Sequence, residues 1–227
     1  MTDFAAARAN MVESQIRPNK VTDPALIGAM GALPREQFVP AGRRPLAYVD
    51  EDLALGAGRH LMEPMVLARL IQTAAPEAGE IALVVGCGTG YAVAVLSRLC
   101  ETVIGVESDA ALAGRAAETL IDLGIDNALV VEGPSSEGYP KQAPYDVILF
   151  DGAIPDFPDA VAAQCAESGR MVGVLTGGGP SVGPGVGPGI GRATVGTKFG
   201  GIVSKRPVFD ATVPPLPEFV EAGVFRF

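Results

Sequence analysis

The stretch that decides the fold is IALVVGCGTGYAVAVLSRLCETVIGVE, residues 81–107. It begins with an apolar run that leads directly into the glycine-rich loop 86–90. Residues 91–99 are predicted to form a helix, and the β-branched run 102–106 predicts a second strand that ends at Glu107. A strand, a glycine loop, a helix and another strand in this order indicate one unit of a parallel sheet.

The rest of the chain continues this alternation outward from the first unit. Helices are predicted over 110–123 and 158–165, and further strands over 128–131, 147–150 and 170–175. Continuous apolar strands that alternate with helices are typical of a mostly parallel sheet covered on both faces. Residues 192–199 and 202–213 predict an antiparallel hairpin at the sheet edge. The expected fold class is a doubly wound, Rossmann-like α/β fold.

The composition of the chain indicates three segments. Residues 1–75 predict an N-terminal helical extension with a loop that carries one short strand, and its helices are expected over 4–16, 25–33 and 64–73. Residues 76–213 predict the sheet-forming core, and residues 214–227 predict a C-terminal tail. Within the core, the Gly/Pro-rich run 177–191 predicts a flexible connecting loop, and a mobile lid near the site is the alternative interpretation.

Charge and cysteine usage exclude several classes of function. The 227-residue chain has a formal net charge of −9, and the whole acidic excess lies after residue 75. A surface that neutralises phosphates carries the opposite sign, so we expect no nucleic-acid partner. Three widely spaced cysteines and one histidine predict neither a disulfide framework nor a zinc site, so we expect no metal.

The sequence also carries an expectation about localisation. Its first residues lack the basic start and apolar run of a signal peptide, and no apolar run reaches the ~18 residues that a membrane-spanning helix needs. We therefore expect a cytoplasmic protein without a membrane partner. The oligomeric state has no signal in the sequence.

The glycine loop and Glu107 predict a site for a nucleoside-containing ligand. Ligands of open α/β sheets bind at the carboxyl ends of the strands, where glycines let the backbone approach closely. Glu107 lies 21 residues after Gly86, where a carboxylate can accept both ribose hydroxyls. A dinucleotide fingerprint requires a third glycine where this chain has Tyr91, so S-adenosylmethionine fits the loop better than NAD. A fold that has lost its ligand is the remaining alternative.

Several segments, in order and spacing, resemble the protein-L-isoaspartate O-methyltransferase family over about residues 8–175. The segments that carry the resemblance are MVESQI (11–16), DPALIGAM (23–30), PREQFVP (34–40), AYVD (47–50), VGCGTGY (85–91) and APYD (143–146). The resemblance implies a class I methyltransferase fold and methyl transfer from S-adenosylmethionine to a carboxylate of a protein or peptide. The cofactor-binding residues that we expect are Val85, Gly86, Gly88, Gly90, Tyr91, Glu107 and Gly133.

The sequence departs from the family pattern in the segment expected to bind the acceptor. The family usually has Gln-Thr-Ile-Ser before a proline, whereas this chain has RHLMEP over 59–64, with His60 at the threonine and Met62 at the serine. A thioether cannot donate a hydrogen bond to a carboxylate. His60, Met62 and Asp151, which follows a predicted central strand, are the candidate catalytic residues. Arg59 is either a carboxylate-binding group or an ordinary surface arginine.

Two further departures concern the cofactor. The family has an acidic residue where this chain has Val84, and an aspartate where it has Pro134. Two hypotheses therefore stay open. The chain is an S-adenosylmethionine-dependent O-methyltransferase in which the replaced Ser and Thr of the acceptor segment argue against isoaspartyl activity, or a non-catalytic or differently specific paralogue that keeps the fold as a binding protein.

Overall fold

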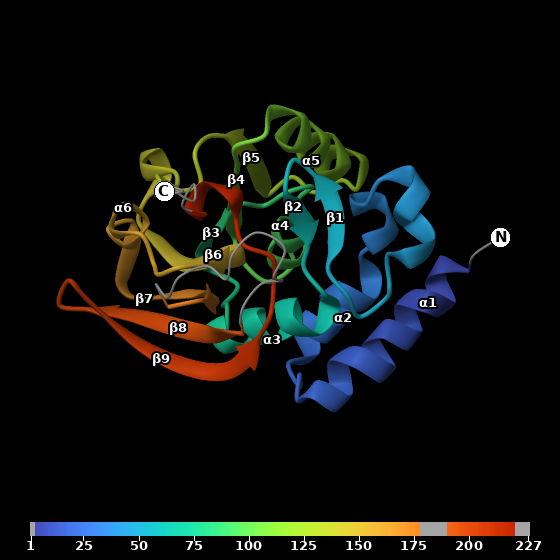
Figure 1. The fold of residues 1–227 in the computed structure, drawn as a ribbon, viewed down its shortest axis with the longest axis horizontal. Helices are drawn as coiled ribbons and strands as arrows, with labels where there is room; N and C mark the ends of the chain where they lie inside the picture. Colours follow the sequence, from blue (N-terminus) through green and yellow to red (C-terminus); the bar gives the residue numbers. More distant parts are fainter. Residues whose placement is uncertain (1–2, 178–189, 221–227) are drawn as a thin grey trace, which may run out of the picture.

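A seven-stranded sheet forms the centre of the computed structural model, which describes residues 3–177 and 190–220 (Figure 1). The strand order is β5-β4-β3-β6-β7-β8-β9; the first five strands are parallel and the last two antiparallel. The strands are β3 (Ile81–Val85), β4 (Thr102–Glu107), β5 (Ala128–Glu132), β6 (Tyr145–Ile154), β7 (Cys165–Leu175), β8 (Gly191–Phe199) and β9 (Ile202–Ala211). The predicted α/β fold with an antiparallel edge hairpin is confirmed.

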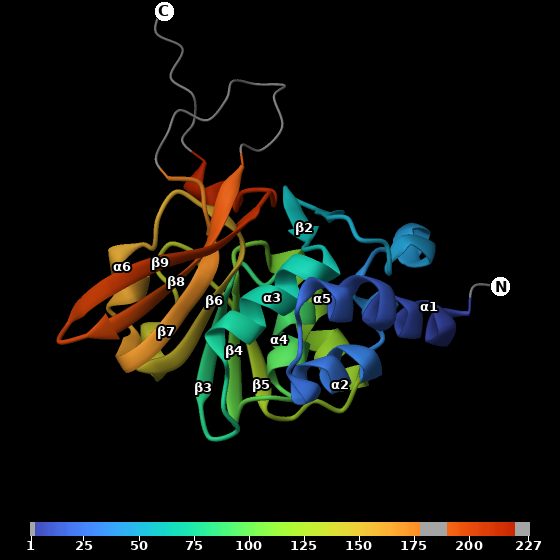
Figure 2. The same cartoon turned by 90° about the horizontal axis from the view of Figure 1, so that it is seen from below.

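The helices cover the two faces of the sheet unequally (Figure 2). They are α1 (Phe4–Met11), α2 (Pro24–Ala32), α3 (Pro64–Ala74), α4 (Tyr91–Leu96), α5 (Ala110–Asp122) and α6 (Asp159–Ala162). Along β3, Ala82 and Val84 pack into the cluster that contains residues of α1 to α5, whereas Leu83 and Val85 pack into a smaller cluster with α6. This alternation follows from the two-residue period of a strand. Because α6 is short, the smaller cluster is completed by residues from other segments, among them Leu216 after β9.

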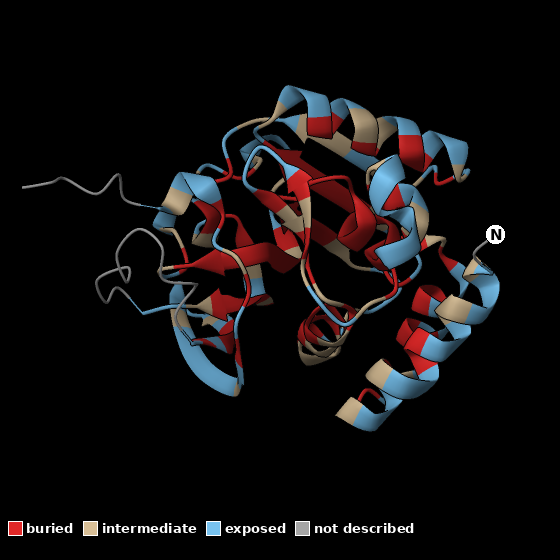
Figure 3. Cartoon of the chain, turned by 45° about the vertical axis from the view of Figure 1, so that its right-hand side comes forward, coloured by how far each residue is buried: buried red, intermediate tan, exposed pale blue. Residues whose placement is uncertain are grey.

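Local sequence signals explain where these helices begin. The Asp23 side chain accepts hydrogen bonds from the backbone of Ala25 and Leu26, and Pro24 occupies the first position of α2. The Asp109 carboxylate caps α5 in the same way through the Leu112 amide, at 2.9 Å. Figure 3 shows how burial is distributed over these elements: buried residues concentrate on the central strands and on the inward side of the helices.

The structure corrects several predicted boundaries. Helix α1 ends at Met11 rather than at residue 16, and β7 begins at Cys165 rather than at residue 170. Helix α4 ends at Leu96 rather than at residue 99, and α6 covers only part of 158–165. Strand β6 continues past residue 150 to Ile154, so Asp151 lies within the strand, although beyond its last pair with β3. The segment 40–58 was expected to hold one strand, but a second strand follows it, which gives the small antiparallel sheet β1 (Leu53–Gly56) and β2 (Arg59–Leu61). Most of the predicted flexible loop 177–191 lies outside the described residues.

The edge strand β9 and the segment after it have distinct environments. Most residues of β9 are exposed, and its pairing with β8 contains a register shift next to Thr194, opposite Pro207. After β9 the chain turns back over the sheet: the Ala153 amide donates to Pro214 O at 3.0 Å, and the Leu216 amide donates to Ala153 O at 2.9 Å. A short 3-10 helix, Pro217–Phe219, follows.

Candidate functional site

The glycine loop leaves β3 and leads into α4 as the sequence predicts. Gly86, Gly88 and Gly90 have φ values of +72°, +55° and +89°, in the left-handed region that favours glycine. The amides of Gly86 and Cys87 both donate to Val106 O, at 2.9 and 3.1 Å, which ties the loop to β4. The loop therefore lies at the carboxyl ends of β3 and β4, where ligands of such sheets bind.

Glu107, at the end of β4, is fully buried and holds this loop in place. Its carboxylate accepts hydrogen bonds from the Gly88 amide at 2.7 Å and from the Asp109 amide at 3.0 Å. The Gly133 amide donates to the Glu107 carbonyl at 3.0 Å. The structure thus brings four of the predicted cofactor-binding residues, Gly86, Gly88, Glu107 and Gly133, to the same end of the sheet.

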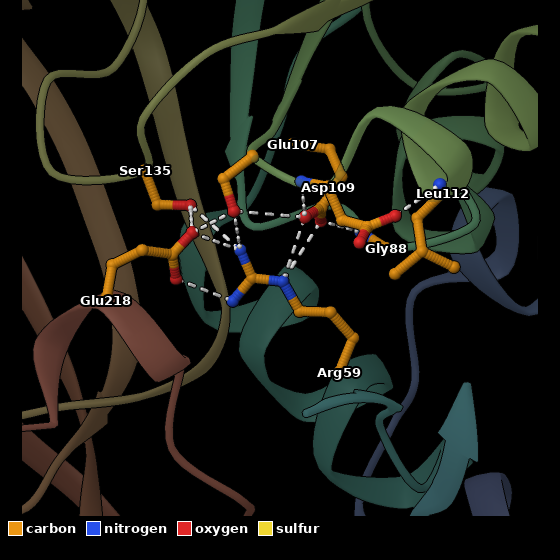
Figure 4. Close-up of polar contacts among 8 residues, drawn as sticks. Arg59, Gly88, Glu107, Asp109, Leu112, Ser135 and Glu218 are labelled. Atoms are coloured by element: carbon orange, nitrogen blue, oxygen red, sulfur yellow. Dashed lines mark hydrogen bonds and ion pairs between the residues drawn. The ribbon is translucent and has the colours of Figure 1, made fainter. Parts of the chain in front are cut away.

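Arg59 occupies the space beside the Glu107 carboxylate (Figure 4). It comes from β2, is 3% exposed, and its Nε lies 3.0 and 3.2 Å from the two carboxylate oxygens of Glu107. The other edge of the guanidinium binds the Glu218 carboxylate, with N–O distances of 2.8 and 2.5 Å. Arg59 is therefore not a surface arginine; it binds two carboxylates, and both belong to its own chain.

Three residues that sequence reasoning missed complete this network. Glu218 comes from the 3-10 helix after β9, while Ser108 and Ser135 follow β4 and β5. Both serine hydroxyls donate to Glu218 and accept from Arg59. Burial raises the pKa of Glu218, but the hydrogen bonds from Arg59 and Ser108 together lower it by more than burial raises it. The pKa of Glu218 is therefore below its ordinary value. Burial likewise lowers the pKa of Arg59, and its bonds to Glu218 and Glu107 more than offset this.

Tyr91 and Val85 lie inside the fold rather than at an open surface. Both are completely buried. The Tyr91 ring packs edge-on against Phe38, with 5.3 Å between ring centres, and the Arg35 guanidinium lies 4.8 Å from the Tyr91 ring centre. Arg35 in turn donates to Ala47 O and Met62 O, each at 2.7 Å. Tyr91 therefore joins the N-terminal extension to the core.

The three candidate catalytic residues, His60, Met62 and Asp151, lie together. With Asp52 they line a cavity of about 10 Å³, the space of about one water molecule. His60 Nδ1 and Asp151 Oδ1 are buried and have no hydrogen-bond partner among the described residues. Burial raises the pKa of Asp151 to about 7. A carboxyl group with such a pKa is an acid or base at neutral pH.

The side of the cavity formed by the N-terminal extension is acidic. The Glu63 amide donates to the Asp52 carboxylate at 2.8 Å. Burial, followed by the charges of Asp52 and Asp50, raises the pKa of Glu63 to about 7. Burial also raises the pKa of Asp52. Crowded carboxyl groups favour protonation, so this edge carries less negative charge than its composition suggests.

The residue types of the site fit S-adenosylmethionine, but the described conformation does not admit it. A Cβ built on Gly86 or on Gly152 would lie 2.6 Å from Leu216 Cδ2. The surface that the glycines would offer to a ligand is therefore covered by Leu216. Glu107, the expected ribose-binding group, already accepts hydrogen bonds from Arg59 through both oxygens.

Two other classes of site are absent from residues 3–177 and 190–220. No group of three His, Cys, Asp or Glu side chains in these ranges could hold a metal ion. Within the same part of the chain, no helix is long and apolar enough to cross a membrane.

Comparison with known proteins supports the resemblance seen in the sequence. The sequence pattern of the family described as protein-L-isoaspartate(D-aspartate) O-methyltransferase matches residues 6–176. A protein-L-isoaspartate O-methyltransferase of Koribacter versatilis is 42% identical over 172 residues, covering 76% of this chain and 78% of the relative. Protein-L-isoaspartate O-methyltransferase 1 of Rhodopseudomonas palustris is 41% identical over 171 residues, covering 75% and 70%.

Two solved structures share the fold. One, a protein-L-isoaspartate O-methyltransferase, aligns with a TM-score of 0.77 at 23% identity over 92% of this chain and 65% of its own. The other, a putative protein-L-isoaspartate O-methyltransferase from Plasmodium falciparum in complex with S-adenosyl-L-homocysteine, has a TM-score of 0.72 at 18% identity over 96% of this chain and 100% of its own. The match over residues 6–176 and the relatives at about 40% identity show that the chain belongs to the protein-L-isoaspartate(D-aspartate) O-methyltransferase family of S-adenosylmethionine-dependent enzymes.

Proposed function

We propose that this chain transfers a methyl group from S-adenosylmethionine to a carboxylate of a protein or peptide. Membership of the family over residues 6–176 carries the proposal. The left-handed glycine loop and the buried Glu107 add support. The glycines let the backbone approach a ligand closely, and Glu107 supplies a carboxylate that can bind the ribose hydroxyls. Gly86, Gly88 and Glu107 would hold the cofactor after Leu216 and Arg59 have moved.

The acceptor would bind where His60 and Asp151 line the small cavity. When bound, S-adenosylmethionine supplies a methyl group on a sulfonium, which an ionised carboxylate attacks without a base. The work left to the protein is therefore orientation. A protonated Asp151 can donate one hydrogen bond to the acceptor, and His60 Nδ1 can donate another when it carries the proton. Met62 supplies only an apolar wall.

A methyl-transfer assay with labelled S-adenosylmethionine tests this proposal. An isoaspartyl peptide is compared with the aspartyl peptide of the same sequence and with a mixture of aged proteins. We expect transfer to at least one of them, and its loss in Glu107→Ala. Binding of adenosylhomocysteine without transfer to any carboxylate would exclude this acceptor class. Failure to bind adenosylhomocysteine at millimolar concentration would exclude the cofactor itself.

A second function is favoured by one observation. Leu216 and Arg59 fill the space beside Gly86 and Glu107 that a nucleoside would take. A protein that keeps the fold but no longer binds the cofactor could fill this space with its own side chains. In that case the chain would be a non-catalytic binding protein. Methyl transfer to any acceptor, abolished by Glu107→Ala, would rule this alternative out.

A further inference from the structure

The segment 213–219, here called the C-terminal strap, crosses the carboxyl ends of the central strands (Figure 1). It lies beyond the residues that match the family. Backbone hydrogen bonds join it to Ala153 of β6, and Val213 and Leu216 are each 2% exposed. Three of its seven residues are prolines, which lack the amide that would anchor them further. The strap is thus packed against the sheet but held by few backbone bonds.

Leu216 fills the crevice where the strand order reverses. Strands β3 and β6 are neighbours that continue in opposite directions across the sheet, and ligands of doubly wound sheets bind at such a point. Leu216 Cδ2 lies 2.6 Å from a Cβ built on Gly86, after β3, and equally close to one built on Gly152, at the end of β6. The side chain therefore uses the space that both glycines leave open.

Glu218 holds Arg59 in the position in which it covers Glu107, the second group that the cofactor needs. It binds the Arg59 guanidinium at 2.8 and 2.5 Å, and the same guanidinium covers both oxygens of Glu107. Ser108 and Ser135 also donate to Glu218. Because these contacts form one connected network, ribose hydroxyls cannot reach Glu107 until Arg59 moves, and Glu218 holds Arg59 in place.

We propose that the C-terminal strap is an intramolecular competitor of the nucleoside cofactor. This inference rests on the proposed function. The strap leaves the crevice and Arg59 releases Glu107 before the cofactor binds. The apparent affinity then equals the intrinsic affinity multiplied by the fraction of molecules with the strap open, so a variant with a weakened strap binds more tightly. Bound cofactor in turn keeps the strap open.

Titration of the full chain with adenosylhomocysteine in a calorimeter tests the competition. Leu216→Ala removes the side chain that fills the crevice, and Glu218→Gln removes the charge that holds Arg59 without changing the volume. Val220→Ala is the matched control, because Val220 follows the strap and is 47% exposed. We expect at least tenfold tighter binding in Leu216→Ala, a smaller gain in Glu218→Gln, and no change in the control.

Hydrogen exchange of the Leu216 amide gives an independent readout. This amide donates to Ala153 O, so its exchange reports whether the strap is in place. We expect saturating adenosylhomocysteine to accelerate its exchange in the unmodified chain. Equal measurable affinities in all variants, with unchanged exchange, would overturn the competition and leave the proposed function standing. Weaker binding in both strap variants would show that the strap supports the site, and would also overturn it.

A complete absence of binding has a different meaning. If thermal unfolding shows that Glu218→Gln is folded, and neither it nor the unmodified chain binds adenosylhomocysteine, both the proposed function and the competition fail. Glu218→Gln keeps the experiment decisive if Leu216→Ala does not fold.

Discussion

Arg59 lies between two carboxylates that are 111 positions apart in the chain, Glu107 and Glu218. Removing one partner of a buried ion pair costs more than the pair contributes, because it leaves the other charge without compensation in a medium of low dielectric constant. Glu107 is the more sensitive partner, since it is completely buried whereas Glu218 is 22% exposed.

Arg59→Met is therefore expected to lower the free energy of unfolding by about 3 kcal/mol, which a urea titration measures. Arg17→Met is the control, because Arg17 pairs with Glu13 at a site where the two side chains are 52% and 66% exposed. Such a pair contributes about 0–1 kcal/mol. Equal losses in the two variants would mean that Arg59 does not compensate the buried charge of Glu107.

Asp151 makes the stability of the protein depend on pH. Burial raises its pKa from the ordinary 3.8 to about 7, so the folded state holds a proton that the unfolded state has lost over this range. Stability therefore falls as the pH rises from about 4 to 7 and stays lower above 7. Asp151→Asn removes this loss, so its gain over the unmodified chain should be larger at pH 8 than at pH 5, by about 2 kcal/mol or more.

Urea titrations of Asp151→Asn at the two pH values measure the difference. Asp126→Asn serves as the control, since Asp126 is exposed. A pH-independent effect of Asp151→Asn would show that the carboxyl group is ionised throughout.

At the scale of elements, the unit from β3 to β4 could be predicted from sequence because each part has a local cause. The apolar run, the glycines and the β-branched residues act over neighbouring positions. One short strand was expected in the segment that contains β1, but the three-residue strand β2, of mixed polarity, and its pairing with β1 had no such signal. The roles of Arg59 and Glu218 depend on segments distant in sequence, which no local pattern encodes.

The turn into α4 depends on Gly90. An added Cβ would lie 3.1 Å from Ala116 Cβ of α5, and the φ of +89° is strained for any other residue. We expect Gly90→Ala to destabilise the protein by about 1–3 kcal/mol. Gly114→Ala, on the exposed side of α5 with nothing within 4 Å of its Cβ, should be neutral or stabilising by up to about 1 kcal/mol. Thermal unfolding compares the two, and a similar loss in both would contradict this account of the turn.

The whole molecule is joined by a hydrophobic cluster that runs from the N-terminal extension into the sheet. Met11 of α1 and Val172 of β7 both belong to it and are almost completely buried. Separating the N-terminal extension from the sheet would therefore expose apolar side chains of both parts to water.

We expect a single unfolding transition for the extension and the core. Met11→Ala and Val172→Ala should each shift the whole transition, by about 2–5 kcal/mol for the methionine and less for the valine. Far- and near-ultraviolet circular dichroism give coincident curves if unfolding is cooperative. Separate transitions would show that the extension unfolds by itself, and the shift caused by Met11→Ala would then affect only the first.

The edge strand β9 has a consequence for crowded solutions. An open strand edge offers unpaired amides and carbonyls on which another chain can assemble. Pro207 has no amide to offer, the register shift opposite it increases the local twist, and the exposed Arg206 places a charge on the strand that disfavours pairing with a second copy. At high concentration, this border of the sheet should resist fibril-like stacking and help to keep the molecules dispersed.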